Sequence, residues 1–181
     1  MKAQIEELLR STKREGIENV ITYLAESNFY TAPASGTLQY HNCVVGGLAD
    51  HSYKVYQHAT MLNELLPANK KFSKESIILV GLLHDIGPKV NTYKDNILAS
   101  GKISDKKPYV KNDTFKIGHG EKSVIVLLQK GLKLTEEEIS GIRWHMNAFD
   151  DIGFYKGKDS WNKLSILCFI ADYFSSQFLE E

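Results

Sequence analysis

The chain has too few cysteines, too little net charge and too short apolar runs for several classes of protein. Cys43 and Cys168 are its only cysteines, so it has neither a disulfide framework nor a paired-cysteine zinc site. Lys and Arg number 22 and so do Asp and Glu, which argues against a dominant basic surface but not against a local basic patch. No run approaches the ~20 apolar residues of a membrane span, and the N-terminus has no apolar signal core. We therefore expect a soluble, cytoplasmic protein without a membrane partner.

Most of the chain has the apolar spacing of helices, without internal repeats or low-complexity segments. We expect an all-α helical bundle that forms a single domain over residues 1–181. Its expected parts are N-terminal helices over 1–28, a core over 45–90 and 118–178, and an insertion over 91–117. The insertion is rich in lysine and has short β-like pieces at Asn91–Tyr93 and Tyr109–Val110. It predicts a short irregular segment or a β-hairpin that interrupts the bundle.

Local capping signals indicate where two of the core helices begin. Ser73 is a candidate N-cap for KESIILVGLLHD, a largely buried helix that we expect to end near Gly87 and Pro88. Thr135 and Glu138 stand three residues apart in a capping-box pattern, which predicts a helix that runs to about residue 147. Both helices carry polar residues that interrupt their apolar pattern.

Asp172 is the most unexpected of these polar residues, because the surrounding ILCFIADYFSS is apolar on nearly every side of a helix. Its helical neighbours Cys168, Ser175 and Ser176 are small and leave room for a group to approach the carboxylate. A buried aspartate needs a cation, a metal or dense hydrogen bonding. The alternative is a structural aspartate that caps another helix or pairs with Arg143.

Four histidines and a second aspartate also stand out. His84 and Asp85 follow the apolar run IILVGLL, which predicts either a deeply placed pair or a polar cap at the helix end. His51 begins a helix behind two glycines, and alone it would be a surface or core-edge histidine. His119 lies between two glycines, and His145 lies late on an amphipathic helix. A lone histidine in either place is more often structural than a metal ligand.

Together these residues predict a metal site, because a helical bundle can bring distant positions to one interior point. The six candidate ligands are His51, His84, Asp85, His119, His145 and Asp172. Imidazoles mixed with carboxylates suit manganese, iron, cobalt, nickel or zinc, whereas magnesium, the alternative, prefers more oxygen. Six ligands exceed the need of one open metal, so two divalent metals bridged by Asp85 are the economical arrangement. His58 lies roughly 10 Å beyond His51 on the same helix, and we assign it to surface or packing.

The order H…HD…D, formed by His51, His84-Asp85 and Asp172, resembles the signature of the HD-domain metal-dependent phosphohydrolases. Two further histidines resemble the additional ligands of the two-metal subgroup, and similar local sequences extend over nearly the whole chain. The resemblance implies a first metal held by His51, His84, Asp85 and Asp172, and a second held by His119 and His145 with Asp85 as the bridge. It also implies the hydrolysis of a phosphoester by a metal-activated hydroxide.

Asp85 and Lys89 are the expected catalytic residues. The family often places a lysine three residues after the aspartate of the HD pair, whereas here that position is Pro88 and Lys89 follows it. This one-residue shift is a departure from the family pattern. The expected substrate contacts are Lys54, Lys122, Arg143 and His41. Solvated or ion-paired surface charge is the alternative for Lys89, Lys122 and Arg143.

The expected substrate is a small phosphoester, either a nucleotide or the end of a short single-stranded oligonucleotide. Lysines and aromatic residues are interleaved in 91–117, which suits phosphate attraction and base stacking, and a solvated hairpin is the alternative. The rival functions are a cyclic-nucleotide phosphodiesterase, an HD-type di-iron oxygenase, a non-catalytic nucleotide-binding module and a plain helical protein. The sequence is compatible with a monomer or with a homodimer through the N-terminal helices.

Overall fold

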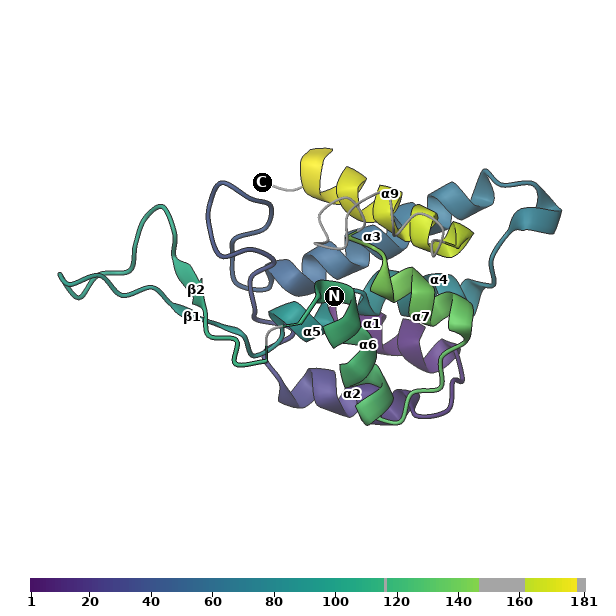
Figure 1. The fold of residues 1–181 in the computed structure, drawn as a ribbon, viewed down its shortest axis with the longest axis horizontal. Coiled ribbons are helices and arrows are strands. Elements are labelled where there is room, and N and C mark those ends of the chain that lie inside the picture. Colours follow the sequence, from purple (N-terminus) through teal and green to yellow (C-terminus); the bar gives the residue numbers. More distant parts are fainter. Residues whose placement is uncertain (116, 147–161, 179–181) are drawn as a thin grey trace.

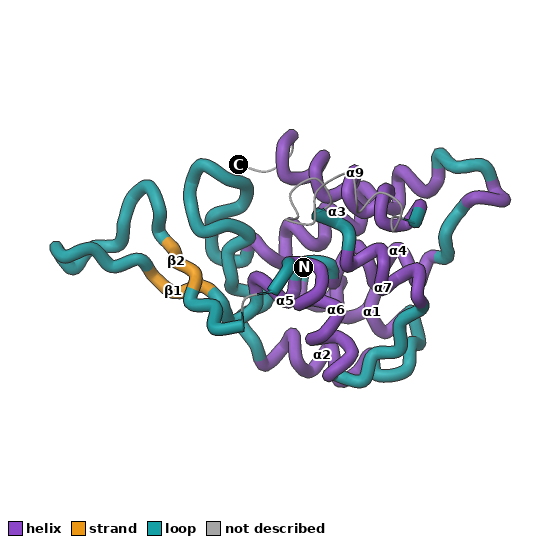
Figure 2. The backbone as a smooth tube through the Cα atoms, viewed as in Figure 1, coloured by secondary structure: helices purple, strands orange, loops and turns teal. Residues whose placement is uncertain are grey.

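The computed structural model describes residues 1–115, 117–146 and 162–178. These residues form a helical body from which a two-stranded ribbon projects (Figures 1 and 2). The elements are α1 (Lys2–Ser11), α2 (Ile17–Glu26), α3 (Gly47–Glu64), the short 3-10 helix η1 (Ala68–Lys70), α4 (Lys74–Leu83), α5 (Ile86–Lys89), β1 (Tyr93–Asp95), β2 (Tyr109–Lys111), α6 (His119–Gln129), α7 (Glu136–Arg143) and α9 (Lys163–Phe178). The all-α architecture with a hairpin insertion is confirmed. No described helix is long and apolar enough to cross a membrane.

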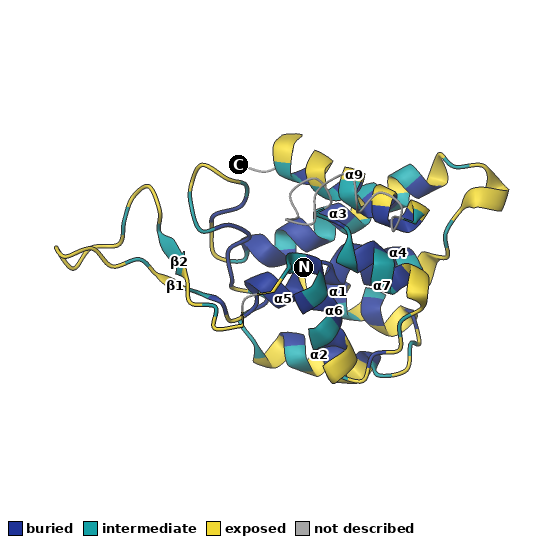
Figure 3. Cartoon of the chain, viewed as in Figure 1, coloured by how far each residue is buried: buried dark blue, intermediate teal, exposed yellow. Residues whose placement is uncertain are grey.

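Helix α4 lies at the centre of the body. It begins as predicted, with the Ser73 side chain accepting a hydrogen bond from the Ser76 amide at 3.1 Å. Every residue from Ile77 to Leu83 is buried, because α1, α3 and α7 all pack against the helix (Figure 3). At Gly81 an added Cβ would lie 2.7 Å from the Tyr56 Cα of α3. A larger residue there would therefore push the two helices apart.

Helix α4 ends earlier than the sequence predicted. Instead of continuing to Gly87 and Pro88, α4 ends at Leu83, and α5 begins two residues after His84. Proline inside a helix lacks its N–H and clashes with the carbonyl four residues earlier, which here is that of His84. In the first turn of a new helix the same proline is tolerated. Pro88 therefore accounts for the turn that contains His84 and Asp85.

Helix α7 also ends early, at Arg143 rather than near residue 147. At this end of α7 the start of α6 packs closely against it. An added Cβ on Gly120 would lie only 2.1 Å from the Arg143 carbonyl oxygen. His145 consequently lies in the turn after α7 and not on the helix itself. The residues that follow Met146 up to residue 161 lie outside the described part of the chain.

The predicted hairpin is present as an antiparallel ribbon. Tyr93 pairs with Lys111, and Asp95 pairs with Tyr109. The loop before α3 joins the outer edge of β2, since the Tyr109 amide donates to the Gly36 carbonyl at 3.3 Å. The ribbon and this loop are therefore joined by hydrogen bonds beside the helical body, where the loop lies next to the ribbon (Figure 1).

A buried ion pair fastens the loop between α1 and α2 to the start of α7. Arg14 donates two hydrogen bonds to the Glu138 carboxylate, at 2.6 and 2.7 Å, and Glu138 is fully buried. The predicted capping box is confirmed, with Glu138 also accepting from the Thr135 amide at 2.8 Å. Ser76 of α4 donates to the same carboxylate at 2.8 Å. Burial would raise the pKa of Glu138, but the hydrogen bonds from Arg14 and the other donors outweigh it and lower the pKa.

We expect Arg14→Ala to lower the free energy of unfolding at pH 7 by about 3 kcal/mol, because it leaves a buried carboxylate without its cation. The pKa of Glu138 is lowered by folding, so the contribution is present above the unfolded value of about 4.3 and is lost as the pH falls through the folded value. Urea unfolding at several pH values measures both effects.

The matched control is Lys2→Ala, which removes an i,i+4 pair with Glu6 at 3.9 Å and a cation 5.3 Å from the centroid of the Tyr30 ring. It should cost less than about 1 kcal/mol. Equal losses for Arg14→Ala and Lys2→Ala, or a loss for Arg14→Ala that does not shrink in acid, would contradict this role of the ion pair.

Candidate metal centre

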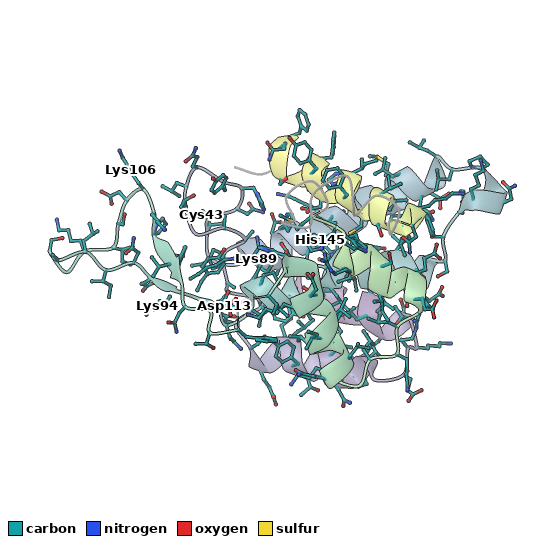
Figure 4. All side chains as sticks on the ribbon, viewed as in Figure 1. Cys43, Lys89, Lys94, Lys106, Asp113 and His145 are labelled. Carbon is teal, nitrogen blue, oxygen red and sulfur yellow. The ribbon has the colours of Figure 1, made fainter. Side chains whose placement is uncertain are left out.

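Five of the six predicted ligands meet where α3, the α4–α5 turn, the turn after α7, and α9 come together. Helix α3 packs against both α4 and α9, and α7 packs against α9. These contacts bring positions 51 and 172 of the chain to the same interior point as the turn at 84–85. Figure 4 shows His145 and Lys89 beside this point, within the helical body.

The first group consists of His51, His84 and Asp172, whose candidate ligand atoms all lie within 4.8 Å of one another. His51 Nε2 is 3.2 Å from Asp172 Oδ1 and 3.3 Å from His84 Nε2. Both histidines are fully buried, and the Asp172 side chain is 13% exposed. Burial would raise the pKa of Asp172, but the hydrogen bond and charge of His51 outweigh it and lower the pKa to about 2.

The second group consists of His84, Asp85 and His145, and it shares His84 with the first. Asp85 presents one oxygen to each side: Oδ1 lies 3.4 Å from His145 Nε2, and Oδ2 lies 3.8 Å from His84 Nε2. Oδ2 is also 3.9 Å from His51 Nε2. Asp85 therefore lies between the imidazoles, in the position expected of a shared ligand.

Hydrogen bonds on the far side of two rings fix how the imidazoles face the centre. His84 Nδ1 lies 3.0 Å from the Gly81 carbonyl, and His145 Nδ1 lies 2.7 Å from the Ile142 carbonyl. A carbonyl oxygen only accepts hydrogen bonds, so Nδ1 carries the proton in each ring. In a neutral ring the other nitrogen, Nε2, then has a free lone pair. Burial lowers the pKa of His84 to about 4 despite the charge of Asp85, so this ring is neutral near pH 7.

The residues present fit a bound cation. Asp85 Oδ1 and His145 Nε2 are both buried and have no hydrogen-bond partner in the described structure. Lone pairs that face a buried carboxylate repel it unless a positive charge lies between them. Burial would lower the pKa of His145, but the hydrogen bond and charge of Asp85 outweigh it and raise the pKa. Mixed imidazole and carboxylate ligands are those of divalent transition metals.

His119, the sixth predicted ligand, begins α6 and lines the wall of the same cavity, but it lies outside both ligand groups. Burial, more than the charges around it, lowers its pKa to about 4. The second metal, which the sequence assigned to His119 and His145, therefore stays a prediction.

Lys89 is the cation closest to the centre among the described residues. Its Nζ lies 3.3 Å from Asp85 Oδ2 and donates to the Ala34 carbonyl. Burial would lower the pKa of Lys89, but the charge of Asp85 outweighs it and raises the pKa. Burial also opposes ionisation of Asp85, and Lys89 is the largest influence that holds the pKa of this carboxyl well below its usual range.

The predicted substrate contacts are distributed unevenly. The ring centroids of His41 and His51 lie 4.8 Å apart, and His41 lines the cavity over the centre. The other three are held by carboxylates: Lys54 by Asp50 at 2.7 Å, Lys122 by Asp113 and Arg143 by Glu121. None of these three is among the described residues that line this cavity. Their contact with substrate stays a prediction.

The cavity over the centre has a volume of about 230 Å³. The sequence did not identify Phe169 and Tyr173, which lie on α9 beside Asp172 and line it. Helical spacing offered a signal, because Phe169 and Ser176 stand three residues before and four after Asp172 and both border the cavity. Ser175, which the sequence placed in the small-residue stripe, instead bonds His58 Nδ1 at 2.8 Å. The assignment of His58 to packing agrees with this contact.

A family model described as the HD domain matches residues 48–177, a span that contains both ligand groups and the intervening ribbon. A search of curated proteins and a search of solved structures returned no match. The matched segment covers well over half of the chain and begins just before His51. The chain therefore belongs to the HD domain family, a helical fold whose members are usually metal-dependent hydrolases of the phosphohydrolase superfamily.

Proposed function

We propose that this protein is a metal-dependent phosphohydrolase that cleaves a phosphoester of nucleotide size. The observation that carries the proposal is the set of buried acceptor atoms of His84, Asp85 and His145 that face one another. Such a set favours a positive charge at its centre, because it places a buried carboxylate against imidazole lone pairs, and Lys89 reaches only one of the two carboxylate oxygens. It is the arrangement expected of side chains that hold a cation.

One or two divalent transition metals are the cofactors we propose, with manganese, iron, cobalt, nickel and zinc as the fitting ions and magnesium as the alternative. Bound there, they would supply the charge that polarises a phosphoester and lowers the pKa of a coordinated water. His51, His84, Asp85 and Asp172 would hold the first ion. His145, together with Asp85 and with a contribution from His119, would hold the second.

The protein's own side chains have three tasks in this proposal. The Gly81 and Ile142 carbonyls orient the imidazoles of His84 and His145 so that their Nε2 atoms face the centre. Asp85 balances the positive charge that gathers there. Lys89 adds a fixed positive charge at the cavity wall, where it stabilises negative charge on phosphoryl oxygens.

The size of the substrate follows from two adjoining cavities. The one over the centre, about 230 Å³, shares Tyr40, His41, Lys89 and His119 with a second of about 510 Å³ between the loop before α3 and the ribbon. Volumes of this order suit small molecules. We therefore favour a nucleotide, or the end of a short single strand, over a long duplex.

A first test is a panel of nucleotides, cyclic nucleotides and short single strands, each assayed for hydrolysis with Mn²⁺-loaded protein. We expect phosphate or a nucleotide to be released from at least one class. Metal analysis of the purified protein provides the control for loading. Loaded protein that is inactive toward every class with each of the five transition metals would contradict the proposal.

We expect Asp85→Asn to weaken metal binding by more than about 100-fold and to abolish hydrolysis, because Asp85 lies in contact distance of three imidazoles. Metal titration followed by spectroscopy or elemental analysis measures the first effect. The matched control is Asp105→Asn, an exposed carboxylate of the ribbon that should leave both quantities unchanged. Full metal binding by Asp85→Asn would rule out its role as a ligand.

We expect Lys89→Met to lower kcat about 100-fold, the effect of removing one donor to a developing negative charge. Metal content should not fall, because the substitution removes a positive charge that repels cations. Lys130→Met is the control, since its Nζ lies over the Tyr23 ring at 4.6 Å, at the end of α6. An unchanged kcat, or a loss of activity that tracks a loss of metal, would show that Lys89 does not act on the substrate.

A further inference from the structure

The larger cavity, about 510 Å³, lies between the ribbon and the loop before α3, next to the metal centre. Its two walls are joined, because the Tyr109 amide bonds the Gly36 carbonyl at 3.3 Å and the Leu38 amide bonds the Lys106 carbonyl at 3.2 Å. An added Cβ on Gly36 would lie 3.2 Å from the Tyr93 ring, so the loop runs directly against the tyrosine. The cavity is therefore a built part of the fold rather than a gap beside a separate hairpin.

The register of the ribbon determines which side chains face this cavity. Residues that pair across the strands share one face, so Tyr93, Lys111, Asp95 and Tyr109 lie on the same face. Tyr93, Tyr109 and Lys111 line the cavity. Lys94 belongs to the opposite face, as the paired partner of Val110. The ribbon thus directs two aromatic rings and one ammonium group into this cavity.

The charge of the cavity lining is positive. Lys89, Lys107 and Lys111 line it, and no aspartate or glutamate is among its described lining residues. In the described structure, Lys107 and Lys111 form no ion pair, whereas Lys89 is engaged by Asp85. Desolvation, and after it the charge of the nearby Lys89, lower the pKa of Lys111. Like charges at neighbouring positions of one cavity repel one another. An anionic group between them would relieve this repulsion.

The two tyrosines add a surface for a flat ring. Their ring centroids lie 6.4 Å apart with the planes at 63°, so they form two sides of a corner. Aromatic side chains of this kind stack with nucleobases without demanding one base. The corner lies beside Lys111 on the same ribbon face, so a ring and an anion can be bound together.

We infer that this cavity is a recognition subsite for the part of the substrate beyond the scissile phosphoester, namely a nucleoside that carries a second phosphate. Tyr93 and Tyr109 contact the base, and Lys111, with Lys107, holds the second phosphate. This inference rests on the proposed function for the identity of the reacting group, but the binding that it describes does not depend on turnover.

The direct test is calorimetric titration of metal-free protein with adenosine 3′,5′-bisphosphate. We expect Lys111→Ala to weaken binding about tenfold, the effect of losing one charged hydrogen bond, and Lys111→Arg to retain most of the affinity. Lys94→Ala is the matched control, because the register places Lys94 on the opposite face of the same ribbon, and it should bind as the unaltered protein does. Figure 4 shows Lys94 on the ribbon. Raised salt should weaken binding less in Lys111→Ala.

Equal affinities for Lys111→Ala and Lys94→Ala, or no binding of the bisphosphate, would overturn the inference. A free nucleotide and the end of a single strand offer the same chemistry. Titration with a tetra-adenylate separates them, since a gain in affinity over the bisphosphate assigns the strand and no gain assigns the nucleotide.

A second measurement separates this inference from the proposed function. Hydrolysis of p-nitrophenyl phosphate, which has no second phosphate, tests the metal centre alone in Mn²⁺-loaded protein. If the protein hydrolyses this ester but Lys111→Ala does not change its affinity for the bisphosphate, the subsite is refuted and the proposed function stands. Binding that depends on Lys111 in a protein without phosphoesterase activity would keep the subsite and refute the function.

Discussion

A buried carboxylate that faces three imidazole nitrogens is the constraint on which the rest of the structure depends. Asp85 lies within 3.9 Å of the Nε2 atoms of His51, His84 and His145. Each partner comes from a different element, so the helices must hold their crossing positions within a small tolerance. The buried helix α4 and its close contact with α3 at Gly81 hold these positions, because a close-packed core has few voids into which helices could shift.

The sequence was sufficient for the helical architecture and the hairpin, because apolar periodicity, the capping box of α7 and turn residues are local signals. The break between α4 and α5 was also encoded locally, in Pro88, whose clash with the His84 carbonyl forbids one continuous helix. The end of α7 at Arg143 was not encoded locally, since α6 packs against the helix at this residue. Contacts between elements set such boundaries, and a single sequence does not display them.

The same distinction between local and long-range contacts decides which ion-pair partners of the cations could be predicted from the sequence. Lys54 pairs with Asp50, four residues earlier on one helix, and this partner was visible in the sequence. The partners of Lys122 and Arg143 depend on how the ribbon and the helices fold back. Lys89 resembles Lys54 in this respect, because its partner Asp85 also lies four residues earlier in the chain.

The attachment of the loop before α3 to the ribbon also has a consequence for self-association. Gly36 and Leu38 occupy the hydrogen-bonding edge of the ribbon on the β2 side, while in the described chain no strand covers β1. An uncovered edge is a template on which a second molecule can add a strand. Here that edge is three residues long and carries the charges of Lys94 and Asp95, features that deter such pairing. These features make the projecting ribbon a poor template for strand addition.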